Sequence, residues 1–284
     1  MLGITRTPGG TTGKSQRLLA GLLFSSGIAL LAYRSRSLNK SGVVGAIASG
    51  TTILGMGGWS WGLSLVYFFA SSSLLSHFRK QDKFRTAADK FSKGSQRDIA
   101  QVTANGGVAT LIALTYGLTH HHLVQAGFVG TLATATADTW ATELGVLSPH
   151  QPRLITTGER VPAGTSGGIT LHGTGAAALG GLSLGLVFWA VGRFCKSLAS
   201  LPLIALVSGL AGSFFDSLLG ATVQAMYYCP NCNKETERRI HSCGTKTQPL
   251  RGISWINNDV VNFLATLFGG VVAMGIQRNM NRAR

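Results

Sequence analysis

Residues 168–192 read GITLHGTGAAALGGLSLGLVFWAVG, a run that contains no Asp, Glu, Lys or Arg. A helix of about 20 such residues is long enough to cross a hydrocarbon core about 30 Å thick. Similar runs follow one another along the chain, and only 12% of its residues are charged, against about 25% in a soluble domain. The sequence therefore predicts an all-α protein, a polytopic transmembrane helix bundle.

We expect about eight spans in a single transmembrane domain that covers residues 1–284. The second is the weakest, because its many glycines lower helix propensity, although small residues also let membrane helices pack closely. The first run follows three basic residues, as in a signal peptide, but no convincing cleavage site comes after it, which favours a retained helix. The predicted spans are residues 17–33, 41–57, 59–78, 98–118, 124–146, 168–192, 199–222 and 257–277.

The charge distribution predicts the orientation of the bundle. Eight spans place four polar loops on one face, and these loops carry most of the 25 Lys and Arg residues. Basic residues gather in cytoplasmic loops, where they meet anionic lipid, so the formal net charge of +15 indicates a membrane rather than nucleic acid as partner. The cytoplasmic loops are predicted to be residues 34–40, 79–97, 147–167 and 223–256.

Ten acidic residues are few enough to sort by position. A carboxylate in an apolar span costs several kcal/mol unless it is paired or binds a cation, so acids in or at the ends of spans are functional candidates. These candidates are Asp98, Asp138, Glu143, Asp216 and Asp259. The remaining acids lie in polar loops, where we expect solvated surface charges: Asp82, Asp89, Glu159, Glu235 and Glu237.

Residues 137–145, ADTWATELG, form the sharpest polar segment. On a helix Asp138 and Thr142 share one face, while Thr139 and Glu143 share the neighbouring one. Hard oxygen ligands of this kind suit Mg²⁺, which proteins usually hold through one or two carboxylates while substrate phosphates and water complete the shell. Alternatively, the carboxylates pair with Lys or Arg of another helix.

Two further polar groups open or close predicted spans. Asp216, Gly220 and Gln224 recur at i, i+4 and i+8, along one stripe of a helix. The last span begins with Asn257, which could merely cap the helix. Asn258 follows it, and capping does not require the further polar residues Asp259 and Asn262.

Phosphate binding is predicted for two loops. Residues 164–168, GTSGG, can curl so that backbone N–H groups surround phosphate oxygens, although such a sequence is often only a turn. The basic loop 79–97 leads into Gln101 and Asn105. A charge run is commonly a solvated collar, but Lys80 and Lys83 are candidates for holding nucleotide or lipid phosphate.

The inserted loop 223–256 contains the spacing Cys229-x2-Cys232-x8-His241-x-Cys243. Three thiolates and one imidazole match a tetrahedral structural zinc site, and the Cys-Pro-x-Cys knuckle is a good local signal. A redox pair or idle thiols are the alternatives. Cys195 lies outside this pattern, and we expect it only to pack.

The chain resembles the integral membrane family that contains transmembrane protein 19 and the plant and cyanobacterial phytyl-phosphate kinases. The resemblance runs over most of the chain after residue 70, although Thr142 and Ser166 stand where the family usually has Ser and Asn, and the Cys/His loop occurs in only part of the family. The segments that carry it are residues 101–106 (QVTANG), 137–145 (ADTWATELG), 164–168 (GTSGG), 216–224 (DSLLGATVQ) and 257–262 (NNDVVN).

The resemblance implies a membrane lipid kinase that transfers a phosphoryl group from a nucleoside triphosphate, CTP, to an isoprenyl monophosphate of phytyl type. It implies catalytic roles for Asp138, Glu143, Asp216 and Asp259, with Mg²⁺ held by Asp138, Thr142, Glu143 and Asp216. The expected phosphate-binding or nucleotide-binding residues are Lys80 and Lys83 from the basic loop, together with Gln101, Asn105, Gly164, Thr165, Ser166, Gly167, Gly168, Gln224, Asn258 and Asn262 from the segments that carry the resemblance.

Other functions stay open at this point. A lipid cytidylyltransferase or a polyprenol kinase would use the same kind of site. A transporter of lipid phosphates or ions would instead line a path near the bilayer midplane that both faces can reach. The host membrane is expected to be a bacterial inner membrane or a plastid membrane, and an oligomer is compatible with the sequence.

Overall fold

The computed structural model describes residues 11–87 and 96–283. Within the predicted basic loop 79–97, Asp89, Lys90 and Lys93 therefore lie outside the described residues. The long helices are α1 (Thr11–Arg34), α2 (Lys40–Gly57), α3 (Trp59–His77), α5 (Ile99–Thr119), α6 (His122–Gly145), α7 (Leu171–Val191), α8 (Leu201–Thr222) and α9 (Asn258–Arg282). The short elements are the helix α4 (Lys80–Ala87), the 3-10 helix η1 (Lys196–Leu198) and the strands β1 (Arg153–Leu154), β2 (Gly168–Ile169), β3 (Met226–Cys229), β4 (Lys234–Thr236) and β5 (Gln248–Arg251).

Each of the eight predicted apolar runs forms a helix, which confirms the helical class. The sixth begins later than predicted, because Gly168 and Ile169 belong to β2. Among the described residues, four helical segments are long and apolar enough to cross a membrane: Ser15–Arg34, Leu171–Val191, Leu201–Thr222 and Asn258–Arg282. The remaining long helices, α2, α3, α5 and α6, are not among these four, so the count of eight spans stays a prediction.

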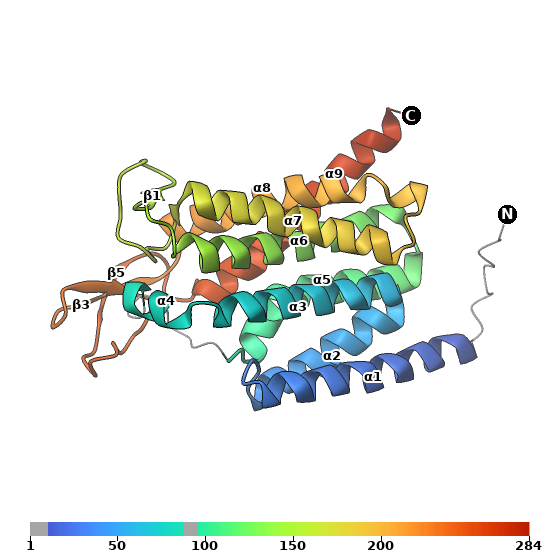
Figure 1. Ribbon diagram of the computed structural model, residues 1–284, viewed down its shortest axis with the longest axis horizontal. Helices are drawn as coiled ribbons and strands as arrows, with labels where there is room; N and C mark the ends of the chain where they lie inside the picture. Colours follow the sequence, from blue (N-terminus) through green and yellow to red (C-terminus); the bar gives the residue numbers. More distant parts are fainter. Residues whose placement is uncertain (1–10, 88–95, 284) are drawn as a thin grey trace.

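The long helices run side by side, and the short polar elements gather at one end of them (Figure 1). We call this the loop end; it carries α4, β1, β3 and β5, while the C-terminus lies at the opposite end. The segment between α1 and α2 reaches the same neighbourhood, since Leu38 forms a bridge with Arg97 just before α5. This arrangement agrees with the prediction that these loops share one face.

Helix α6 forms the centre of the bundle, and every residue from Ala126 to Ala137 is buried. Small residues bring α9 close to it: a Cβ on Gly269 would lie 1.8 Å from the Thr134 hydroxyl. Toward the end opposite the loops, the Trp61 ring stacks on Phe128 with a centroid distance of 4.0 Å. The interior is therefore close-packed, as expected from the many glycines.

The predicted loop 223–256 is instead a small folded unit. Its strands form an antiparallel sheet in the order β4-β3-β5, with Tyr227 opposite Thr236. We call residues 226–251 the β unit. A second antiparallel pair, β1 and β2, frames the segment that contains the predicted phosphate loop. The description of the fold as all-α is thus corrected for the loop end, where polar sequences form short strands.

Candidate functional site

A cavity of about 590 Å³ opens among the loop-end elements, and we call it the polar cavity. It brings together most of the residues that the sequence singled out, from α4 to α9. The predicted site residues that line it are Lys80, Lys83, Gln101, Asn105, Asp138, Thr142, Glu143, Gly164, Thr165, Ser166, Gly167, Gly168, Asp216, Asn258 and Asn262.

Two of the predicted catalytic or phosphate-binding residues do not line the polar cavity. Asp259 is absent from its wall, although its neighbours Asn258 and Asn262 contribute to it, because residues one position apart point in different directions on a helix. Gln224 is buried behind the wall with 1% of its surface exposed. The structure therefore assigns Gln224 a supporting position, and it gives Asp259 no place at the cavity.

The carboxylates of Asp138 and Asp216 meet at the polar cavity from two adjacent helices, α6 and α8. The Ser213 hydroxyl donates a hydrogen bond of 3.4 Å to Asp138. The Oδ2 atom of Asp216 is buried and has no hydrogen-bond partner among the described residues. Because a buried carboxylate oxygen without a partner is costly, this pair suits a bound cation.

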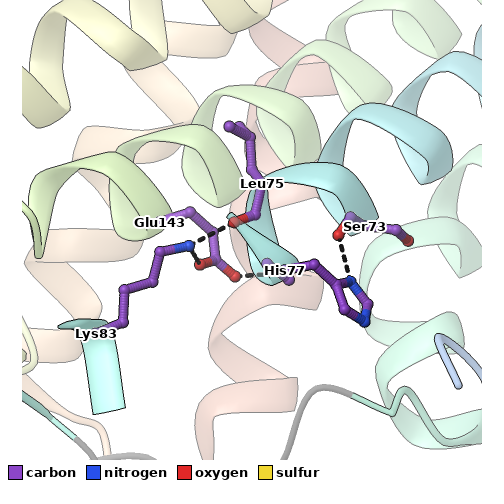
Figure 2. A network of polar contacts seen from close by, with 6 residues as sticks. Ser73, Leu75, His77, Lys83 and Glu143 are labelled. Atoms are coloured by element: carbon purple, nitrogen blue, oxygen red, sulfur yellow. Dashed lines mark hydrogen bonds and ion pairs between the residues drawn. The ribbon is translucent and has the colours of Figure 1, made fainter. Parts of the chain in front are cut away.

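The Glu143 carboxylate, in contrast to that of Asp216, has two close side-chain partners. Lys83 Nζ lies 2.5 Å from Glu143 Oε2, and the Ser76 hydroxyl donates to Oε1 at 2.5 Å. Figure 2 shows the Lys83 ammonium between the Glu143 carboxylate and the main-chain carbonyl of Leu75, to which it also donates. For Glu143, the structure thus realises the alternative that a lysine from another helix pairs with the acid.

Arg97 lines the polar cavity, although only Lys80 and Lys83 were predicted from the cations of its loop. Its guanidinium lies over the rings of Phe68 and Phe69, 5.8 and 5.4 Å from their centroids. Burial lowers the pKa of Arg97 to about 10, while the charge of Glu143 acts in the opposite direction. Arg97 therefore stays protonated at neutral pH and supplies a fixed cation.

Asp98, one of the five acidic candidates, has a structural role in this fold. Its side chain accepts a hydrogen bond of 2.9 Å from the N–H of Gln101, and Gln101 Oε1 accepts one from the N–H of Asp98. This capping box begins α5. The cap fixes Gln101 at the cavity wall, and Asn105 follows one turn later, donating to the Gln101 carbonyl at 3.1 Å.

The glycine segment 164–168 forms part of the cavity wall. Gly164 and Gly167 have φ angles of 77° and 85°, a conformation that favours glycine. The Ser166 hydroxyl donates a hydrogen bond of 2.9 Å to Gln224. Because the segment packs tightly against α8, a Cβ on Gly167 would lie 2.5 Å from that of Ala221. The turn is therefore fixed against α8 with its backbone at the cavity.

The β unit contributes Glu237 and Arg238 to the cavity wall. Glu237 was expected to be a solvated surface charge, but Gln224 Nε2 donates a hydrogen bond of 2.9 Å to it. Arg251 of β5 donates to the carbonyls of Gly220 and Ala221, both at 2.8 Å. These contacts attach the β unit to the end of α8, and no pattern in the sequence indicated them.

The Cys/His cluster, Cys229, Cys232, His241 and Cys243, lies in the β unit. The candidate ligand atoms all lie within 4.8 Å of one another, and the sulfurs of Cys229 and Cys243 are 3.7 Å apart. Tetrahedral zinc with Zn–S bonds of about 2.3 Å would separate two sulfurs by about 3.8 Å. The cluster can therefore hold a metal ion.

Thiol ionisation in the cluster is uneven. Hydrogen bonds with Thr245 and His241 lower the pKa of Cys243 to about 5, so that thiol is ionised at neutral pH. Interactions with Cys243 raise the pKa of Cys232 to about 11. A bound metal would favour the thiolate form of each cysteine ligand, whereas Cys195 lies outside the cluster, after α7.

Comparison with known proteins agrees with the membrane fold. Protein PGR of Arabidopsis thaliana is 36% identical over 274 residues, which cover 88% of this chain and 93% of that protein. An uncharacterised membrane protein of Methanocaldococcus jannaschii is 31% identical over 258 residues, 91% of this chain and 93% of that one. Protein VTE6, chloroplastic, of Arabidopsis thaliana is 28% identical over 262 residues, 90% of this chain and 69% of that protein.

No solved structure matches the chain. The family model described as integral membrane protein DUF92 matches residues 23–270, which include every segment that carries the resemblance described above. The match and the relatives confirm that resemblance. The chain belongs to the integral membrane protein family DUF92.

Proposed function

We propose that this protein is a membrane lipid kinase that transfers a phosphoryl group from a nucleoside triphosphate, CTP by family resemblance, to an isoprenyl monophosphate of phytyl type. The observation that carries the proposal is the polar cavity, where half-buried carboxylates, cationic side chains and a glycine turn converge at one end of an apolar bundle. The chloroplastic relative VTE6 favours a plastid membrane as host, with a bacterial inner membrane as the alternative.

Asp138 and Asp216 would hold Mg²⁺. The unpartnered Oδ2 of Asp216 and the electrostatic repulsion between these two carboxylates both favour a bound cation. Glu143 is engaged by Lys83 and Ser76, so we assign it to positioning Lys83 rather than to the metal, and Thr142 contributes only a hydroxyl at the cavity wall. When bound, Mg²⁺ would neutralise charge between the reacting phosphates.

Phosphoryl transfer needs alignment and charge neutralisation more than a protein nucleophile. An oxygen of the lipid phosphate would bond to the terminal phosphorus of the nucleotide, and the bond from that phosphorus to the bridging oxygen would break, releasing a nucleoside diphosphate. Arg97 and Lys83 would bind phosphate oxygens, together with backbone N–H groups of residues 164–168. Asn258 and Asn262 would complete the polar wall.

The placement of polar groups supports an enzyme over a transporter. A transporter requires a polar path near the midplane. Here the described polar wall is at the loop end, whereas the buried half of α6 from Ala126 to Ala137 and the stacked rings of Trp61 and Phe128 fill the interior beyond it. A cavity that opens at one interface suits a reaction between a membrane lipid and a soluble nucleotide.

For the Cys/His cluster we propose a structural Zn²⁺. Three sulfurs and one imidazole form the closed ligand set typical of structural zinc, and the sulfur separation of 3.7 Å fits it. Among the described residues the cluster lies apart from the polar cavity wall. Its role would be to hold the β unit, which supplies Glu237 and Arg238 to that wall.

The test is to purify the protein and offer phytyl and longer isoprenyl monophosphates with Mg²⁺ and each nucleoside triphosphate. We expect an isoprenyl diphosphate and a nucleoside diphosphate, detected by mass spectrometry, and no product after EDTA treatment. A lipid linked to CMP with release of pyrophosphate would instead identify a cytidylyltransferase, and phosphorylation of a free polyprenol would identify a polyprenol kinase. No product with any combination would contradict the proposal.

A further inference from the structure

A second, smaller cavity of about 80 Å³ lies among α1, α2, α3 and α5. Its wall is mostly apolar and comes from all four helices. Each helix contributes apolar side chains, among them Ile28 and Ala29 of α1, Ala46 of α2, Val66 and Phe69 of α3, and Val102 of α5. We call it the apolar cavity. Its charged and amide side chains are Arg97, Gln101 and Asn105, and the hydroxyls of Ser25 and Ser49 are its other polar side-chain groups.

The apolar cavity adjoins the polar cavity. Phe68, Arg97, Gln101 and Asn105 line both. Arg97 marks the junction, because its guanidinium covers the Phe68 and Phe69 rings while it also lines the wall that contains Lys83 and Glu143. A molecule that reaches from one cavity into the other would have an anionic group beside Arg97 and an apolar group beyond it.

We propose that the apolar cavity holds the part of the substrate's hydrocarbon chain that adjoins its phosphate, with Arg97 contacting the phosphate at the junction. This inference rests on the proposed function and specifies how its site takes a lipid. An amphiphile with one anionic head and one apolar chain complements Arg97 at the junction and the apolar wall beyond it. Because the apolar cavity is much smaller than the polar one, the distal chain would continue into the bilayer.

The proposal predicts where a bound chain can be captured. An isoprenyl monophosphate with a photoreactive diazirine near its phosphate is irradiated with the full-length protein in detergent, without nucleotide, and adducts are mapped by mass spectrometry. We expect adducts on α1, α2, α3 and α5 at the apolar cavity, and we expect unlabelled isoprenyl monophosphate to compete. Adducts confined to exposed side chains such as Leu179 and Leu203, or labelling without competition, would overturn the proposal.

Two alanines of α2 provide a matched pair. Ala46 lines the apolar cavity, whereas Ala48, on the same helix, is exposed. Ala46→Leu should reduce the competable labelling about tenfold, in line with discrimination by shape in an apolar pocket, and Ala48→Leu should leave it unchanged. Equal labelling of the two variants would contradict the proposal.

If Ala46→Leu misfolds, Val66→Ala tests the same chain site, because it enlarges the apolar cavity without adding atoms. This variant should keep the labelling and extend it to a chain with an added methyl branch near the phosphate; rejection of that chain would count against the proposal. The labelling requires no turnover, so the two failures are distinguishable. Competable labelling without any kinase product would reject the kinase alone, and kinase activity without labelling at the apolar cavity would reject the chain site alone.

Discussion

The Cys/His cluster and the polar cavity are both groups of polar side chains in a largely apolar protein, but they are assembled over very different lengths of chain. The cluster uses four ligands between Cys229 and Cys243, within one small sheet. The polar cavity draws its wall from residues between Phe68 and Asn262. The geometry of the Cys/His cluster depends on local spacing along the chain. The geometry of the polar cavity depends on how several packed helices are rotated and shifted relative to one another.

The two regions are physically joined. Glu237 lies between the ligands of the cluster in sequence and accepts a hydrogen bond from Gln224, which in turn accepts one from Ser166 of the glycine segment. A change in the β unit should therefore reach the cavity with a reduced effect. The largest losses of activity are expected at the carboxylates of the polar cavity, and the smallest in the β unit.

Asp138→Asn should reduce turnover of the proposed reaction about 100-fold to 1000-fold, the range typical when one preorganised electrostatic group is lost. The amide keeps the shape but removes half of the carboxylate pair that favours Mg²⁺. Turnover is measured at saturating Mg²⁺, with gel filtration as the check for folding. Asp82→Asn is the control, because Asp82 forms an exposed ion pair with Arg79; equal activity of the two variants would remove the metal assignment.

Cys229→Ser should abolish the zinc content of the purified protein, which we expect to be one ion per chain in the unaltered protein. Cys229 is a fully buried member of the cluster, and a hydroxyl is a much poorer zinc ligand than a thiolate. Elemental mass spectrometry measures the effect. Cys195→Ser should retain the metal, and the assignment fails if the unaltered protein carries no zinc or if both variants lose it equally.

Gly167→Ala should reduce activity and thermal stability together. The φ angle of 85° disfavours any Cβ, and the added carbon would also meet Ala221 at 2.5 Å. Gly158→Ala is the matched control, because Gly158 has a φ angle of 73° but open space around it, so it should lose only the backbone contribution of about 1–2 kcal/mol. Equal melting temperatures for the two variants would show that the packing of residue 167 on α8 is unimportant.

Glu237→Ala should have the smallest effect, raising KM a few-fold and lowering the melting temperature slightly. The change removes the carboxylate acceptor of the buried Gln224 amide and leaves it only the weak contact with the Met226 sulfur at 3.9 Å, which costs about 1–3 kcal/mol, but it removes no group of the carboxylate pair. Steady-state kinetics and thermal unfolding measure the two effects. Glu235→Ala, two residues earlier and outside the cavity wall, should change neither quantity; a loss as large as that of Asp138→Asn would make Glu237 part of the chemistry itself.

Much of the polar cavity could be predicted because its residues occur in short polar segments that interrupt apolar runs. Asp138, Asp216 and the glycine segment 164–168 were conspicuous for that reason, and the structure brings them together. Arg97 and Glu237 were not conspicuous in the sequence, because each lies in a polar loop among other charged residues. Their positions depend on the contacts of Arg97 with Phe68 and Phe69 and on the sheet that places the β unit against α8.

The sequence by itself determined the helical class, the approximate bounds of the long helices, and the membership of the Cys/His cluster, because these follow from apolar length and local spacing. Only the tertiary structure decided that Glu143 pairs with Lys83, that Asp98 caps a helix and that Asp259 lies off the cavity wall. The physical reason is that a period of 3.6 residues fixes which side chains share a helix face. The direction in which that face points is set by contacts between residues far apart in the chain, such as Gly269 against Thr134.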